Sequence, residues 1–200
     1  MSEMKWIAGQ IAFRERMPPL PAAKMTDAQR KAAEEMIAGP RKGVKGPFVP
    51  LLRSPELMDR LQKVGEYLRF QSSLDQRISE LVMLVVSREW TQQFEWFVHV
   101  PLGRKAGISE DTIAALADGR RPSGMSEDEQ VAHDFCEELL RNKGVSQTTY
   151  RRAVDRFGEN GVIDMLGVAG YFTTVSMIMN VAHSPPQAVE SVAPLVPYPL

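Results

Sequence analysis

Residues 76–90, QRISELVMLVVSREW, form the most apolar of the helices that the sequence predicts. Every residue from 81 to 86 is apolar, which indicates a helix buried on several sides rather than one with a solvated face. Ser73 and Gln76 have the spacing of a capping box at its start. We therefore expect a core helix at this position.

Helix signals recur on both sides of this segment. Capping boxes begin at Thr26 and Ser126, and Ser54-Pro55 places a proline at the first helical position. No segment shows the period-two alternation of a half-buried strand, so we predict an all-α fold. The predicted helices cover residues 26–39, a segment that begins at 54, and residues 73–90, 91–106, 109–119, 126–144, 147–157 and 159–182.

The chain of 200 residues has the length of a single domain. Residues 1–24 contain several prolines and show little periodic pattern, so we predict an arm that lies over its own domain or reaches a neighbouring subunit. Residues 25–186 form the predicted helical domain, and residues 187–200 a C-terminal tail. The loop from Gly39 to Pro50 is rich in glycine and proline and long enough to have a function.

The composition excludes several classes of partner. A net charge of −1 provides no basic surface for nucleic acid, and we expect no membrane partner because no apolar run approaches the ~20 residues of a membrane span. The first residues, MSEMKWIAGQ, lack the features of a signal peptide. A lone Cys136 cannot form an internal disulfide, which fits a reducing cytoplasm. We expect a soluble cytoplasmic protein.

Glu80 is the most unusual residue of the apolar segment. Its neighbours on the helix surface include Met83 and Leu84, so its carboxylate should be partly desolvated and disposed to hold a proton. The alternative is a surface ion pair between Glu80 and Arg77.

Glu95 and His99 are four residues apart and share one face of a helix. A carboxylate one turn before a histidine can hold the imidazole in one tautomer and raise its basicity. The alternative is an ordinary ion pair on an amphipathic helix. Two acids and an imidazole without a thiol indicate proton chemistry. The flanking aromatic residues are candidates for the walls of a pocket: Trp90, Phe94, Trp96 and Phe97.

The same three residues have the ligand types of a transition-metal site. However, the sequence has no second histidine nearby and no H-E-x-x-H motif. We therefore expect neither a metal nor another cofactor, and keep a metal-dependent enzyme as an alternative. His133 and His183 carry no partner pattern and are expected to be structural, and Cys136 is expected to pack in the core.

The run from 77 to 109, RISELVMLVVSREWTQQFEWFVHVPLGRKAGIS, resembles the carboxymuconolactone decarboxylase and AhpD-like superfamily. The superfamily motif is a glutamate, eleven residues, and then C-x-x-C-x-x-x-H. Its acid and histidine fall on Glu80 and His99, and its two cysteines fall on Gln92 and Glu95. The resemblance extends over roughly residues 48–183. It implies an AhpD-like helical bundle that assembles as a homotrimer or homohexamer, with sites near subunit contacts.

The missing cysteines decide which activity the resemblance implies. In AhpD-like members the cysteine pair reduces peroxides, so we expect no thiol peroxidase activity here. The cysteine-free branch includes the enzyme that decarboxylates γ-carboxymuconolactone in aromatic catabolism without a cofactor. The resemblance thus implies a carbon–carbon lyase that acts on a small unsaturated acid or lactone. A non-catalytic oligomeric binding module is the remaining alternative.

Residue roles follow from both lines of reasoning. Glu80, Glu95 and His99 are the expected catalytic residues, with His99 protonating the anion that forms after loss of carbon dioxide. Four further residues are candidates for substrate binding because they are polar or aromatic and fall near this site or on the last apolar helix: Trp96, Arg77, Tyr171 and Asn180.

Overall fold

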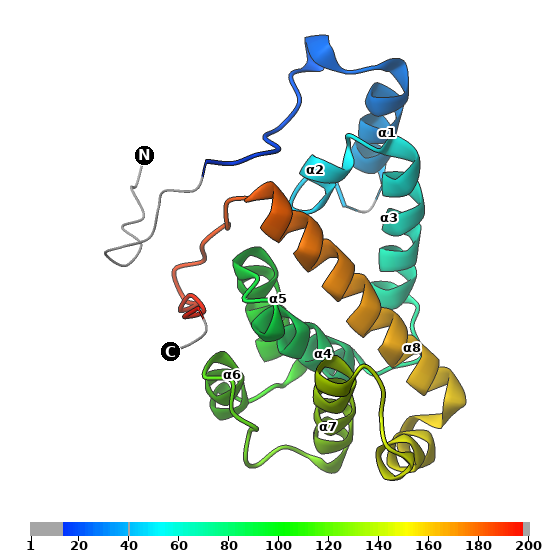
Figure 1. Cartoon of the computed structure of the whole chain (residues 1–200), viewed down its shortest axis with the longest axis vertical. Coiled ribbons are helices and arrows are strands. Elements are labelled where there is room, and N and C mark those ends of the chain that lie inside the picture. The colour runs from blue at the N-terminus through cyan, green and yellow to red at the C-terminus, as the bar shows by residue number, and fades with distance from the viewer. Residues whose placement is uncertain (1–13, 40, 198–200) are drawn as a thin grey trace.

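In a computed structural model that describes residues 14–39 and 41–197, the chain is helical, and the described residues contain no strand (Figure 1). The predicted all-α fold is therefore confirmed. Within the described residues, a short 3-10 helix, η1, precedes eight α-helices. Their bounds are η1 Ala22–Lys24, α1 Asp27–Ala38, α2 Phe48–Leu51, α3 Pro55–Phe70, α4 Gln76–Glu89, α5 Gln93–Ala106, α6 Glu110–Ala117, α7 Glu127–Asn142 and α8 Gln147–Ala182.

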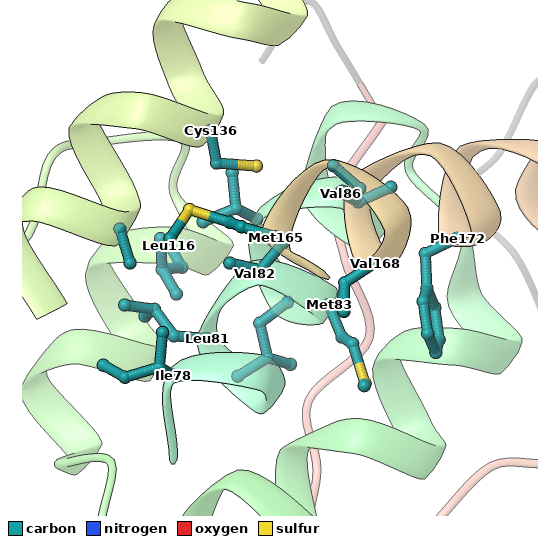
Figure 2. Close-up of a cluster of buried hydrophobic side chains, with 14 of the residues drawn as sticks. Ile78, Leu81, Val82, Met83, Val86, Leu116, Cys136, Met165, Val168 and Phe172 are labelled. Atoms are coloured by element: carbon teal, nitrogen blue, oxygen red, sulfur yellow. The ribbon is translucent and has the colours of Figure 1, made fainter. Parts of the chain in front are cut away.

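Helix α4 lies at the centre of the core, as its composition predicts. Every residue from Ile78 to Arg88 is buried, and the helix packs against α5, α6, α7 and α8. Figure 2 shows its apolar side chains surrounded by those of three other helices, among them Leu116, Cys136, Met165 and Val168. Because α4 is enclosed on all sides, any polar group that it carries needs an internal partner.

Helix α8 bends at Gly158, where φ is 69° and ψ is 170°. This left-handed conformation favours glycine, and it separates the two helices that the sequence predicts on either side. In the described chain, α8 is the one helix that is long and apolar enough to cross a membrane, judged by length and composition alone. A soluble protein's core helix passes the same test, and 56% of the apolar window of α8 is buried inside the protein.

The helix starts follow their capping residues with one exception. Thr26 and Ser126 both form complete capping boxes. Helix α4, however, begins at Gln76 rather than Ser73, and Asp75 caps it by accepting a hydrogen bond from the Arg77 amide. Ser73 is not a cap because its amide and hydroxyl both donate to Asp164 on α8.

Asp164 is a buried carboxylate that joins α8 to the α3–α4 connection. It accepts hydrogen bonds from the Ser73 amide at 2.7 Å, the Ser72 hydroxyl at 3.0 Å and the Tyr67 hydroxyl at 3.0 Å. Burial acts to raise the pKa of Asp164, but the hydrogen bonds from Ser73, Ser72 and Tyr67 together lower it below its usual value.

We expect Asp164→Asn to reduce the free energy of unfolding by about 1–3 kcal/mol at pH 7, the range for a charged hydrogen-bond network. Because the folded pKa is lowered, this contribution is complete above the unfolded value of about 3.9 and is lost as the pH falls through the folded value. Urea unfolding at pH 7 and pH 3 measures both effects. Asp155→Asn, an exposed site on the same helix, is the control. Equal losses in the two variants would contradict the role given to Asp164.

Both terminal segments lie on the helical domain as far as they are described. The Arg16 amide donates to the Ala182 carbonyl at 2.8 Å, so this part of the predicted arm covers its own domain. The C-terminal segment, residues 187–197, lies against α5, where the Gln93 side chain bonds both the amide and the carbonyl of Leu195. The predicted domain boundaries at residues 25 and 186 stay predictions.

Candidate active site

The packing of α4 against α5 brings together the acid–histidine trio that the sequence singled out. Glu80 comes from α4, and Glu95 and His99 come from successive turns of α5. Their exposed fractions are 0%, 4% and 1%, so three ionisable side chains are buried in direct contact. Buried ionisable groups of this kind are concentrated at functional sites.

The imidazole of His99 lies between the two carboxylates. Its Nδ1 is 2.7 Å from Oε2 of Glu80, and its Nε2 is 3.3 Å from Oε2 of Glu95. Gln76 completes the shell by donating to Oε1 of Glu80 at 2.8 Å. The alternative of a Glu80–Arg77 surface pair is wrong, since Glu80 is buried and Arg77 instead lies 4.0 Å from Glu129.

Burial alone would lower the pKa of His99, but the hydrogen bonds to Glu80 and Glu95 outweigh it and raise that pKa above its ordinary value. A protonated His99 donates from Nδ1 to Glu80 and from Nε2 to Glu95. Nε2 and the Glu95 carboxylate thus form a donor–acceptor pair across 3.3 Å when His99 is protonated. Such a pair can release a proton to a reacting atom and recover it afterwards.

A cavity of about 350 Å³ opens on this pair. Glu95 and His99 both line it, whereas Glu80 lies behind His99 and does not. Glu80 therefore acts on a ligand only through the imidazole. About half of the lining residues have apolar aromatic or aliphatic side chains: Pro47, Phe48, Phe70, Phe94, Val98, Phe172 and Val175. Phe172 meets the His99 ring edge-on, with 5.0 Å between the ring centroids.

Only one of the four predicted substrate-binding residues, Tyr171, lines this cavity. Trp96 is buried and donates to the Ala193 carbonyl at 3.1 Å, and Arg77 faces Glu129. Asn180 accepts a hydrogen bond from Gln92 at 2.7 Å and donates to the Trp90 carbonyl. The structure thus gives these three side chains contacts within the fold, away from the lining of this cavity, and their binding of a substrate stays a prediction.

Gln92, at one of the two cysteine positions of the superfamily motif, has a structural function. Its Oε1 accepts a hydrogen bond from the Phe94 amide at 2.7 Å and so caps α5, while its Nε2 holds Asn180 of α8. Glu95, at the other cysteine position, faces the cavity. Of the two positions at which the superfamily motif has cysteines, one therefore holds the residue that caps α5 and the other holds a residue of the cavity wall.

Three basic residues of the cavity wall escaped the sequence analysis. Arg41 and Lys45 come from the loop between α1 and α2, and Arg69 comes from the end of α3. The length of that loop pointed to a function, but nothing in the local pattern placed its cations beside His99. The site therefore combines an acid–base pair with positive charge.

The trio is a poor metal site as it stands. Both imidazole nitrogens face carboxylate oxygens, so a metal would have to displace one of these contacts. Within residues 14–39 and 41–197, no group of three or more His, Cys, Asp and Glu side chains is arranged to hold a metal ion.

Cys136 lies away from the trio, in the apolar core between α7 and its neighbours (Figure 2). It is fully buried, and burial, with smaller contributions from Glu89 and Glu137, raises the pKa of Cys136 to about 12. A thiol in this state is not a thiolate nucleophile at neutral pH.

The trio lies within a stretch with known relatives. Residues 55–138 match the carboxymuconolactone decarboxylase family. This match confirms the resemblance seen in the sequence, and the matched segment contains Glu80, Glu95 and His99. Arg41 and Lys45 precede the carboxymuconolactone decarboxylase segment, and Tyr171 follows it.

The whole chain also has a structural relative. It is similar to a crystal structure described as an alkylhydroperoxidase AhpD core, an uncharacterized peroxidase-related protein from Ralstonia eutropha JMP134. The TM-score is 0.69 at 14% sequence identity, over 88% of this chain and 94% of that chain. At this identity the likeness shows the AhpD-like fold and nothing about activity. No curated protein matches the sequence.

Proposed function

We propose that the protein is a cofactor-free acid–base enzyme that acts on a small unsaturated carboxylic acid or lactone, with decarboxylation as the leading reaction. One observation carries this proposal: Nε2 of His99 lies 3.3 Å from the Glu95 carboxylate at the wall of a cavity that three cationic side chains also line. The carboxymuconolactone decarboxylase match of the same segment supports it.

The reaction needs one anion stabilised and one proton delivered. When the bond between the substrate carbon and its carboxylate breaks, carbon dioxide leaves and the electron pair stays on the substrate as an enolate-like anion. The proton of the Glu95–His99 pair then adds to that carbon, and solvent replaces it. Glu80 keeps Nδ1 of His99 bonded, which orients Nε2 and Glu95 toward the cavity.

Glu95→Gln is the direct test, because the amide keeps the size of the side chain but cannot exchange a proton with His99. Carbon dioxide release and deuterium incorporation would be followed over a panel of unsaturated lactone acids and keto acids. We expect turnover to fall about 100-fold or more. Glu34→Gln, an exposed glutamate on α1, should leave the rate unchanged. Full activity in Glu95→Gln would remove Glu95 from the mechanism.

We further propose that thiol peroxidase activity is absent, and organic peroxides belong in the same panel. The core position of Cys136 supports this proposal. A thiol-dependent peroxide turnover that disappears in Cys136→Ser would contradict it.

We also propose that the protein works as a cytoplasmic homo-oligomer. Large apolar side chains on α3 and α8 are exposed, which a contact between subunits would cover. They include Leu57, Val64, Ile163, Met177 and Val181.

A further inference from the structure

The cations of the cavity differ from those elsewhere on the protein. Among the described residues, no carboxylate lies within 4.0 Å of a charged nitrogen of Arg41, Lys45 or Arg69. Most other described arginines have such a partner, namely Arg30, Arg60, Arg77, Arg104, Arg120, Arg121, Arg141, Arg152 and Arg156. None of these three cavity cations is thus held in a close ion pair with a carboxylate of the described chain.

Arg41 is the most constrained of the three. Its guanidinium carbon lies 4.5 Å from the centroid of the Phe48 ring, and its Nη2 atom is buried with no hydrogen-bond partner in the described part of the chain. Burial and the charge of Arg69 lower the pKa of Arg41, although Tyr171, Glu66 and Glu95 oppose this effect. A partly buried guanidinium without a carboxylate in direct contact is unfavourable, so an anion in the cavity would stabilise it.

Gly65 on α3 makes this arrangement possible. A Cβ atom at position 65 would lie 2.4 Å from the Tyr171 hydroxyl oxygen and 2.9 Å from Nη2 of Arg41. The absence of a side chain therefore allows both groups to pack against α3 beside the cavity. Tyr171 also lines the cavity, and its hydroxyl lies on the same side of α3 as Nη2 of Arg41.

We propose that Arg41, with Arg69, binds the carboxylate of the substrate and determines the specificity of the site for anions. This inference rests on the proposed function and names the residue that selects its substrates. A planar guanidinium matches the two oxygens of a carboxylate, and the surrounding phenylalanine rings match a flat unsaturated body. Because Arg41 precedes the family-matching segment and Arg69 lies within it, part of this specificity comes from a loop outside that segment.

Calorimetric titration with 2-furoate and its neutral amide, 2-furamide, tests the inference without turnover. We expect 2-furoate to bind the wild-type protein at least about tenfold more tightly than 2-furamide. Arg41→Met should weaken 2-furoate binding about tenfold or more and leave 2-furamide binding unchanged. Lys42→Met is the matched control, since Lys42 is the neighbouring exposed cation and does not line the cavity. The affinity of Lys42→Met for 2-furoate should stay within about twofold of the wild-type value.

Two further variants guard against a folding defect in Arg41→Met. Arg41→Lys keeps the charge and should recover part of the affinity, whereas Gly65→Ala keeps Arg41 but displaces it and should weaken 2-furoate binding. Unchanged 2-furoate affinity in Arg41→Met, equal affinities for acid and amide, or no 2-furoate binding by wild type would each overturn the inference. Arg41-dependent binding without any turnover would leave it standing and refute the proposed function instead.

Discussion

Replacing His99 with glutamine is expected to lower kcat/KM about 10²- to 10⁴-fold on any acid that the protein turns over. Glutamine fills a similar volume and can still hydrogen-bond Glu80, but it cannot carry the proton that the Glu95–His99 pair delivers. Stopped-flow assays of carbon dioxide release measure the loss. His133→Gln is the control, because His133 is also buried but lines a separate cavity. The turnover rate of this variant per folded molecule should match that of wild type.

The same variant has a pH signature. The pKa of His99 is raised in the folded protein, so its contribution to stability is complete below the unfolded pKa of about 6.5 and is lost as the pH rises through the folded value. Denaturant unfolding of wild type should show this decline above neutral pH, and His99→Gln should lack it. A variant that kept the decline would show that another group causes it.

Replacing Glu80 with alanine is expected to reduce the free energy of unfolding by about 3–5 kcal/mol, the range for removing one member of a buried ion pair. The loss arises because Nδ1 of a fully buried imidazole would have no carboxylate, and Gln76 would lose its acceptor. Urea unfolding at pH 7 gives the value. Glu34→Ala, an exposed glutamate on α1, should cause only a small change.

Glu80→Gln separates the positioning function of Glu80 from its contribution to stability. The amide oxygen that this variant carries at position 80 can still accept a hydrogen bond from Nδ1 of His99, so most of the stability lost in Glu80→Ala should return. The negative charge that helps to raise the pKa of His99 is nevertheless gone. Titration of the His99 ring by NMR should show that pKa shifted down. If the His99 pKa stayed at its wild-type value, Glu80 would contribute only to packing.

Local signals in the sequence predicted most of the helices. Thr26 and Ser126 cap their helices through contacts three residues away, and Gly107 ends α5 in a left-handed conformation. These features depend on a few adjacent residues, so the sequence contains all the information needed. The pairing of Glu95 with His99 belongs to the same class, because four residues on one helix determine it.

The features that the sequence did not predict depend on distant contacts. Ser73 has the spacing of a cap but bonds Asp164, 91 residues later. Arg41 reaches the His99 cavity because α2 and α3 pack against α8 while α1 packs against α3, an arrangement that Figure 1 shows. No local pattern encodes which loop meets which helix face, so the cationic half of the site became visible only in the structure.

The C-terminal segment has a consequence for how the site responds to proteolysis. Its backbone at Ser191, Ala193 and Leu195 bonds side chains of α5, the helix that carries Glu95 and His99. Three residues at the start of this segment are exposed and so are open to proteolysis, namely Gln187, Ala188 and Glu190. A cut there would free the three hydrogen-bonded residues from α5, whereas the packing of α5 against α4 does not depend on them. Limited proteolysis would therefore separate the acid–base pair from its outer support.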